Sequence, residues 1–275
     1  MAANSLTRRI VKRALAPVVN TRGYQVLQSV AMGWDIRSGQ WHEPELDLIQ
    51  YVVKPGDTVL DIGANFGVYS YYLSSAVGPN GCVYAFEPIP TTCNSFRMIA
   101  KVLRLQNVEL FEKACGDKPG VLKFTVPLQE NGAIIPGIVH MSGRNNSRAG
   151  KERHARFERH KEVECEVIVI DDFLPTLERV SFIKCDVEGA DFYALRGARK
   201  TIERNKPLVV TEINPWFLDG FGVDLKEFVG FFEAMGYRLY RFIDGRLELT
   251  PIEAVEEDNW IFVHEDKKLD VAALL

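Results

Sequence analysis

The fold is decided by a short stretch that runs from residue 58 to residue 67 and reads TVLDIGANFG. Its first half, Thr58 to Ile62, is an apolar run with residue types that favour a β-strand. Its second half is rich in glycine and leads into a helical pattern that ends near Val77, before the breaker sequence GPNG at 78–81. A strand, a glycine-rich turn and a helix in this order begin a βαβ unit, which indicates a parallel sheet.

The same alternation of short strands and helices continues along most of the chain. It pauses for two strands that flank a polar insertion at about 128–161, and near the carboxyl end two strands follow each other with no helix between them. We expect an α/β fold with a mainly parallel sheet and an antiparallel edge strand. The predicted strands are 58–62, 82–86, 108–114, 121–126, 163–170, 181–187, 208–213, 237–242 and 259–263, and the longer predicted helices are 92–103, 190–204 and 225–235.

The composition excludes several classes of protein. The 275 residues include 33 Lys and Arg and 37 Asp and Glu, a net charge of 33 − 37 = −4, with 47% hydrophobic and 25% charged residues. These values are typical of a folded globular protein and not of a disordered chain or a dedicated nucleic-acid binder. No apolar run reaches the roughly 18 residues of a membrane helix. Five cysteines without a C-x-x-C pair, and no visible secretory signal, favour a cytoplasmic location.

Positive charge is concentrated in two places. Residues 1–34 carry +5 because no acidic residue precedes Asp35, and residues 142–161 carry 7 − 2 = +5, so the rest of the chain carries −4 − 10 = −14. Apolar residues recur at helical spacing over 5–16, which predicts a basic amphipathic helix. This helix could pack on the domain, contact an anionic membrane surface, or belong to a mitochondrial transit peptide, which is the least favoured of the three.

We divide the chain into two parts. Residues 1–50 hold the basic helix and a lead-in, and residues 51–275 form one domain that contains the basic insertion at about 128–161.

Candidate ligand-binding residues follow the first predicted strand. Gly63 lets the backbone turn and approach a ligand because it has no Cβ, and Gly67 lets the helix begin close to the strand. The exposed amides at the helix N-terminus can donate hydrogen bonds to a carboxylate. The spacing is not G-x-G-x-x-G, because Ala64 and Asn65 stand where the second glycine would be, so a dinucleotide pyrophosphate is disfavoured.

Two further motifs follow the next strands. Glu87, with Pro88 after it, ends the second strand 20 residues after Gly67, where an acidic side chain can accept hydrogen bonds from both hydroxyls of a ribose. Gly116 and Asp117 follow the third strand, where Asp117 could accept a hydrogen bond from an adenine amino group. Together with the glycine-rich turn, these residues predict a nucleoside site.

A charged cluster lies at the end of a later strand. Strand alternation places Lys184, Asp186 and Glu188 on one side, and such charges are costly to bury without partners, so clusters of this kind are often functional. Glu212, at the end of the following strand, is expected to face the same crevice as Asp186. Asp186, Glu188 and Glu212 could instead hold a divalent cation, which we do not favour. His140, in a loop, is expected to be a surface residue.

These motifs together resemble the FkbM-type S-adenosylmethionine-dependent methyltransferases over roughly residues 55–263. The Lys-x-Asp-Val-Glu-Gly stretch is the most specific part, although Cys185 and Asp191 replace the Ile and Glu that are usual in the family. The resemblance implies a Rossmann-like, seven-stranded class I methyltransferase sheet and O-methylation, often of a sugar or polyketide hydroxyl. The stretches that carry it are VLDIGANFG at 59–67, AFEP at 85–88, IKCDVEGA at 183–190 and NWIFV at 259–263.

The resemblance also implies a role for each motif. Glu87 would hold the ribose of S-adenosylmethionine, Asp117 would lie near the adenine, and Asp186 and Lys184 would lie beside the transferred methyl group. The residues expected along the methionine part are Gly63, Asn65 and Gly67, and the further cofactor-binding candidates are Asp61, Ala64, Tyr69, Pro88 and Gly116.

We expect methyl transfer assisted by a carboxylate, because a sugar hydroxyl is a poor nucleophile that benefits from a general base. Asp186 is the first candidate for the base and Glu212 the second. Lys184 would orient the acceptor, or act as the base if burial depressed its pKa. The alternatives are a NAD(P)-dependent oxidoreductase and a non-catalytic nucleoside-binding module.

The expected acceptor is a small molecule or a glycan. The basic half of the insertion is either a lid that recognises an anionic acceptor, such as a phosphorylated sugar, or a solvated loop, and the two interpretations have equal weight. No nucleic acid is expected among the partners, and a contact with a membrane surface would go through the N-terminal helix.

Overall fold

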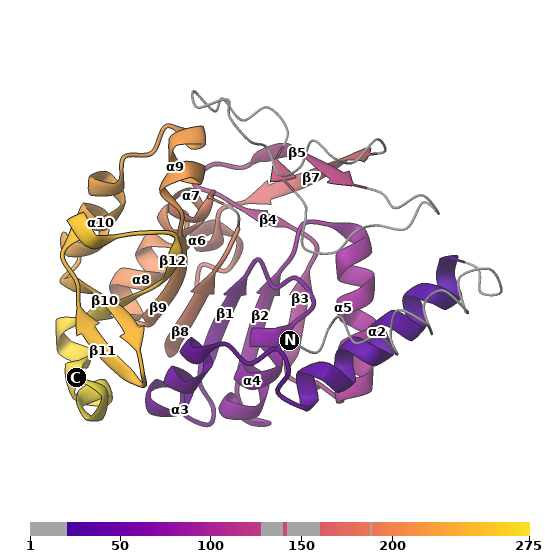
Figure 1. The fold of residues 1–275 in the computed structure, drawn as a ribbon, viewed down its shortest axis with the longest axis horizontal. Helices are drawn as coiled ribbons and strands as arrows, with labels where there is room; N and C mark the ends of the chain where they lie inside the picture. Colours follow the sequence, from indigo (N-terminus) through magenta and orange to yellow (C-terminus); the bar gives the residue numbers. More distant parts are fainter. Residues whose placement is uncertain (1–20, 128–139, 142–159, 188) are drawn as a thin grey trace.

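The computed structural model describes residues 21–127, 140–141, 160–187 and 189–275, which form a large eight-stranded sheet and a small four-stranded sheet (Figure 1). The order in the large sheet is β11-β10-β12-β9-β8-β1-β2-β3. The strands from β9 to β3 are parallel, whereas the β9–β12, β12–β10 and β10–β11 pairs are antiparallel. The bounds are β1 Thr58–Ile62, β2 Cys82–Phe86, β3 Val108–Phe111, β8 Val180–Cys185, β9 Leu208–Ile213, β10 Tyr237–Ile243, β11 Arg246–Leu249 and β12 Asp258–His264.

The predicted mainly parallel sheet with an antiparallel edge is confirmed, but the described residues give it eight strands rather than seven. The additional strand is β11, which pairs with β10 across a turn formed by Asp244 and Gly245. Both turn residues have positive φ values, 49° and 80°, as a two-residue hairpin turn of this type requires. The sequence pattern predicts only the strands 237–242 and 259–263 in this part of the chain.

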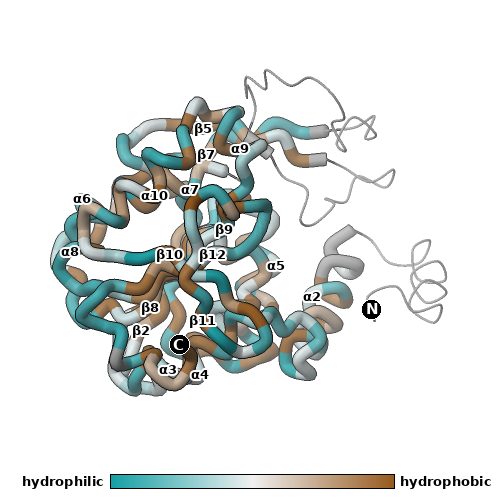
Figure 2. The backbone as a smooth tube through the Cα atoms, turned by 60° about the vertical axis from the view of Figure 1, so that its left-hand side comes forward, coloured by the Kyte–Doolittle hydropathy of each residue, from teal (hydrophilic) through white to brown (hydrophobic). Residues whose placement is uncertain are grey.

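Helices cover both faces of the large sheet. Along β1 the side chains alternate: Leu60 and Ile62 belong to one core cluster and Val59 to the other. In Figure 2 the strands are predominantly hydrophobic and many outer turns are hydrophilic. The first cluster packs against α6 Ile170–Phe173, α7 Asp191–Arg196, α8 Arg199–Asn205, α9 Pro215–Phe221 and α10 Leu225–Glu233, and the second against η1 Pro44–Leu48, α3 Ile49–Val52, α4 Val68–Val77 and η3 Glu265–Leu274.

The boundaries of several helices differ from the prediction. The single helix expected over 190–204 is divided into α7 and α8 at Gly197 and Ala198. The helix expected over 92–103 is α5, Pro90–Leu103, which begins two residues earlier and has Ile89 at its N-cap position. Pro90 suits the first position of a helix, because backbone N–H groups in the first turn have no hydrogen-bond partner within the helix, so the missing N–H of proline costs nothing there.

A long helix packs beside α5. It lies within residues 1–50, the part that was predicted to hold only the basic helix and a lead-in. This helix, α2, spans Thr21–Arg37, and Gly33 allows a close approach to Val102 and Ile99 of α5 (Figure 1). The chain then enters the core directly, since Leu46 and Leu48 of η1 are buried. The predicted helix over 5–16 lies outside the described residues, so its contact with a membrane stays a prediction. Within the described part of the chain, the helices are too short or too polar to cross a membrane.

The small sheet lies at the end of the large sheet where the parallel strands terminate (Figure 1). Its strand order is β4-β7-β5-β6, and Ile89, Val126 and Cys165 pack it against the segment after β2. The strand expected over 108–114 is therefore two strands in different sheets, and His140 begins a strand rather than lying in a loop. The bounds are β4 Ala114–Cys115, β5 Gly120–Pro127, β6 His140–Met141 and β7 His160–Ile168.

Gly63→Ala is expected to destabilise the protein more than Gly245→Ala. The two glycines have similar φ values, 82° and 80°, so alanine carries a comparable strain of about 1 kcal/mol at either position. A Cβ at Gly63 would also lie 1.9 Å from the backbone oxygen of Asp186, whereas a Cβ at Gly245 meets nothing within 4 Å. Urea unfolding should show an additional loss of at least about 1 kcal/mol for Gly63→Ala. Equal losses would contradict the close crossing of β1 and β8.

Candidate active site

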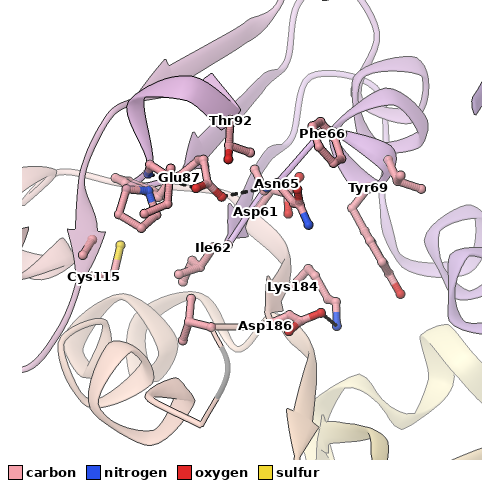
Figure 3. A pocket seen from close by; sticks show the side chains of 18 of the residues that line it. Asp61, Ile62, Asn65, Phe66, Tyr69, Glu87, Thr92, Cys115, Lys184 and Asp186 are labelled. Atoms are coloured by element: carbon pink, nitrogen blue, oxygen red, sulfur yellow. Dashed lines mark hydrogen bonds and ion pairs between the residues drawn. The ribbon is translucent and has the colours of Figure 1, made fainter. Parts of the chain in front are cut away.

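The carboxyl ends of β1, β2 and β8 meet at a cavity of about 270 Å³. Figure 3 shows it extending from Cys115, past Glu87 and Asn65, to Tyr69 and Lys184. Neighbouring parallel strands place their ends at one edge of a sheet, which is where such folds bind ligands. The cavity brings together most of the predicted site residues, namely Asp61, Gly63, Ala64, Asn65, Tyr69, Glu87, Pro88, Lys184 and Asp186.

Glu87 is held rigidly by the backbone around it. The amide of Asn65 donates to Oε2 at 3.1 Å and the amide of Ile89 donates to Oε1 at 3.0 Å. The side chain is 6% exposed, and burial raises the pKa of its carboxyl to about 7. The carboxylate is therefore fixed at the centre of the cavity, beside the glycine-rich turn.

Two other buried carboxylates shape the turns after β1 and β8. Asp61 accepts a hydrogen bond from the Ser70 hydroxyl at 2.5 Å, and burial raises its pKa to about 6. Asp191 accepts hydrogen bonds from the amides of Val187 and Gly189 at 3.2 and 3.0 Å. Burial, and then the charge of Asp186, raise the pKa of Asp191 to about 6. Asp191 is thus the residue that holds the turn between β8 and α7.

Lys184 lies under the cavity with its ammonium group surrounded by acceptors. Its Nζ donates to Oδ1 of Asn259 at 2.8 Å and lies 3.6 Å from Oδ2 of Asp186 and 5.1 Å from the centre of the Tyr69 ring. Burial by itself lowers the pKa of Lys184, but the charges of Asp186, Glu43 and Asp191 outweigh it and the pKa is raised. Lys184 therefore keeps its proton, and the prediction that burial could make it a base is wrong.

Asp186 is more accessible than the other acids of the cavity. Its side chain is 47% exposed, and its backbone amide donates to the carbonyl of Ile62 at 2.9 Å, which ties the end of β8 to the end of β1. An exposed carboxylate beside a fixed ammonium group can accept a proton from a ligand in the cavity.

Four predicted site residues do not line the cavity. Asp117 pairs with Arg196 at 3.0 Å instead, and the segment after β3 lines the cavity through Lys113, Ala114 and Cys115 rather than through Gly116. A Cβ at Gly67 would lie 2.6 Å from the Phe96 ring, so this glycine serves packing of α4 against α5. Glu212 is paired in register with Asn259 across β9 and β12.

The interpretation that Asp186, Glu188 and Glu212 hold a divalent cation stays a prediction. The described residues contain no group of three or more His, Cys, Asp or Glu side chains that could hold a metal ion. Glu188, one of the three proposed ligands, lies outside the described residues.

Several residues of the cavity were not predicted from the sequence. Met32, Trp41 and Glu43 come from the segment before β1, and Leu122 and Phe124 come from β5 of the small sheet. The run WHEPE at 41–45, an aromatic residue and two acids directly before a buried apolar stretch, is the signal that could have identified Trp41 and Glu43.

The chain is similar in sequence to known methyltransferases. The model of the methyltransferase FkbM domain matches residues 61–239. "Methyltransferase 1" of Beauveria bassiana (strain ARSEF 2860) is 28% identical over 150 residues, which are 52% of this chain and 59% of that protein, so the match spans less than two thirds of the relative.

Among the solved structures that are similar to this chain are two methyltransferases of low sequence identity. Methyltransferase FkbM from Methylobacillus flagellatus KT gives a TM-score of 0.46 at 16% identity and covers 88% of this chain and 59% of that one. A SAM-dependent methyltransferase from Aquifex aeolicus gives 0.40 at 18% identity, with coverages of 80% and 87%.

Stability is expected to depend on pH through Glu87. The unfolded chain releases the Glu87 proton near pH 4.5, its ordinary value, whereas the folded protein retains it up to about pH 7. Between these values the folded state binds more protons, so the free energy of unfolding falls as the pH rises, by about 3 kcal/mol in total. Glu87→Gln removes this contribution while the contributions of Asp61 and Asp191 remain.

The measurement is chemical denaturation of both proteins at pH 5 and pH 8. We expect the loss of stability over this interval to be about 2–3 kcal/mol smaller for Glu87→Gln than for the native chain. Parallel pH dependences for the two proteins would contradict the assigned environment of Glu87.

Proposed function

We propose that this chain, which belongs to the FkbM methyltransferase family, transfers the methyl group of S-adenosylmethionine to a hydroxyl of a sugar, glycoconjugate or polyketide-type small molecule. The observation that carries the proposal is the position of Glu87. Two backbone amides fix this carboxylate beside the glycine-rich turn, in the same cavity as the Lys184–Asp186 pair. A hydrogen-bond acceptor for ribose hydroxyls and a pair of residues suited to proton transfer thus lie in one cavity.

The residues of the cavity fit S-adenosylmethionine along its length. Glu87 would accept hydrogen bonds from the ribose hydroxyls, since its oxygens are held in place but still line the cavity. Asp61 would face the ammonium group of the methionine part, next to Gly63 and Asn65. The adenine would lie at the apolar end, which is lined by Ala114, Cys115, Leu122 and Phe124.

Catalysis would depend on positioning and on one proton transfer. S-adenosylmethionine would supply an electrophilic methyl group, whose bond to sulfur breaks as the acceptor oxygen bonds to the carbon. Asp186 would take the hydroxyl proton of the acceptor, because its side chain is accessible at the cavity. Lys184, whose ammonium group donates to Asn259 and lies 3.6 Å from Asp186, would hold the Asp186 carboxylate in place.

Calorimetry separates this proposal from its alternatives. We expect S-adenosylmethionine and S-adenosylhomocysteine to bind and NAD not to bind. Glu87→Gln should weaken both affinities about 10- to 100-fold, because a charged acceptor for the ribose hydroxyls is lost. The control is Glu112→Gln, whose carboxylate pairs with Arg97 away from the cavity and should leave the affinities unchanged. Failure of both nucleosides to bind the native chain would end the methyltransferase proposal, and binding of NAD instead would favour the oxidoreductase.

The identity of the base is tested by two conservative variants. With an acceptor found by screening against methyl-labelled S-adenosylmethionine, Asp186→Asn should lower kcat at least 100-fold and leave cofactor affinity intact. Glu212→Gln should keep kcat within about threefold, because Glu212 does not line the cavity. The reverse pattern would assign the base to Glu212.

A further inference from the structure

The segment that connects α2 to η1 forms one wall of the cavity. This segment belongs to none of the sequence motifs described above. Trp41 and Glu43 of this segment line the cavity together with Tyr69 and Lys184. In Figure 3, Tyr69 and Lys184 lie at the end away from Cys115, with Glu87 between them and Cys115. Because Glu43 contacts Tyr69 directly, this wall belongs to the end of the cavity that the nucleoside motifs leave open.

Glu43 has one oxygen anchored and one available. The Tyr69 hydroxyl donates to Oε2 at 2.9 Å, and the charge of Glu43 is one of those that stabilise the Lys184 ammonium group. No hydrogen bond from the described residues is found at Oε1. A carboxylate held in this way is oriented in advance to accept a hydrogen bond from a ligand hydroxyl at Oε1.

Glu45, two residues later, behaves differently from Glu43. It is 6% exposed, and its Oε2 has no hydrogen-bond partner among the described residues. Burial, and to a smaller extent the charge of Glu43, raise the pKa of Glu45. Glu45 does not line the cavity, so of these two acids only Glu43 can meet a ligand there.

Trp41 adds an aromatic surface beside this carboxylate. Its side chain lines the cavity and is 40% exposed. The face of an indole ring carries partial negative charge and packs well on C–H groups, which carry partial positive charge. An aromatic face next to a carboxylate therefore suits a ring that has an apolar face and hydroxyl groups at its edge.

We propose that Trp41 and Glu43 form the acceptor subsite and bind a pyranose ring. Trp41 packs on one face of the ring, and Oε1 of Glu43 accepts a hydrogen bond from a ring hydroxyl other than the one that is methylated. Both residues bind and orient the acceptor and neither takes its proton. This inference rests on the proposed function, because it requires the acceptor hydroxyl to reach Asp186 at the same end of the cavity.

The first experiment measures binding without turnover. Saturation-transfer NMR of a panel of methyl pyranosides, with simple phenols and aliphatic alcohols for comparison, is recorded on the protein with S-adenosylhomocysteine present. We expect pyranosides to bind the native chain, and Trp41→Ala, Trp41→Leu and Glu43→Gln each to weaken that binding at least 10-fold. Trp41→Leu keeps apolar volume but lacks the aromatic face, so it also covers the case in which the alanine variant fails to fold.

The matched controls change a tryptophan and an acidic residue that lie outside the cavity. Trp34 is 65% exposed on α2, and Asp47 is exposed in η1; neither lines the cavity. Trp34→Ala and Asp47→Asn should leave pyranoside binding unchanged. With the best pyranoside acceptor, the Trp41 and Glu43 variants should raise KM at least 10-fold, change kcat less than about threefold, and leave the affinity for S-adenosylmethionine unchanged.

Tyr69→Phe separates a binding role of Glu43 from a structural one. It removes the anchor of Glu43 but keeps its charge, so the acceptor KM should rise less than in Glu43→Gln. If both variants lower the melting temperature while acceptor KM is unaltered, Glu43 only supports the fold and the inference is wrong.

Two further results would distinguish a failure of the subsite from a failure of the proposed function. Methylation of a phenol or an aliphatic alcohol, with no pyranoside binding, would overturn the subsite and leave the proposed function intact. Failure of S-adenosylmethionine to bind in the calorimetric experiment would instead remove the proposed function itself.

Discussion

The site depends on the close contact between the end of β1 and the end of β8. The amide of Asp186 donates to the carbonyl of Ile62, and a Cβ on Gly63 would lie only 1.9 Å from the carbonyl oxygen of Asp186. Meanwhile the amides of Gly63 and Ala64 donate to the carbonyl of Phe86 at the end of β2. Three strand ends are thus linked through backbone atoms, and this places the glycine-rich turn, Glu87 and the Lys184–Asp186 pair around one cavity.

The pKa values of the buried groups around the cavity depend on burial and on the neighbouring charges together. Burial raises the pKa of Asp61, Glu87 and Asp191, because an isolated carboxylate is poorly stabilised away from water. Lys184 is equally buried, yet its pKa is raised because carboxylates surround it. The ammonium group of Lys184 therefore stays charged, whereas the three buried acids change protonation between about pH 6 and 7. Changes in the net charge of this region near neutral pH therefore come from the acids and not from Lys184.

The walls of the cavity come from parts of the chain inside and outside the region that matches the family model. The family match covers residues 61–239 and so includes the turn after β1, Glu87 and the β8 cluster. Trp41 and Glu43 precede the matched region, and Asn259, which orients Lys184, follows it. The turn after β1, Glu87 and the β8 cluster thus lie within the region that matches the family model, whereas Trp41, Glu43 and Asn259 lie outside it.

The sequence by itself determined the strand–turn–helix unit at 58–77, the parallel sheet with its antiparallel edge, and the meeting of Glu87, Lys184 and Asp186 at one edge. These follow from local patterns, since strand period, turn residues and parallel pairing are encoded over a few residues. Only the tertiary structure decided that Ala114 and Cys115 line the cavity instead of Gly116 and Asp117, that Lys184 keeps its proton, and that Trp41 and Glu43 form a wall. These outcomes depend on packing between segments far apart in the chain, and neither a burial-dependent pKa nor a cavity wall leaves a periodic signal in the sequence.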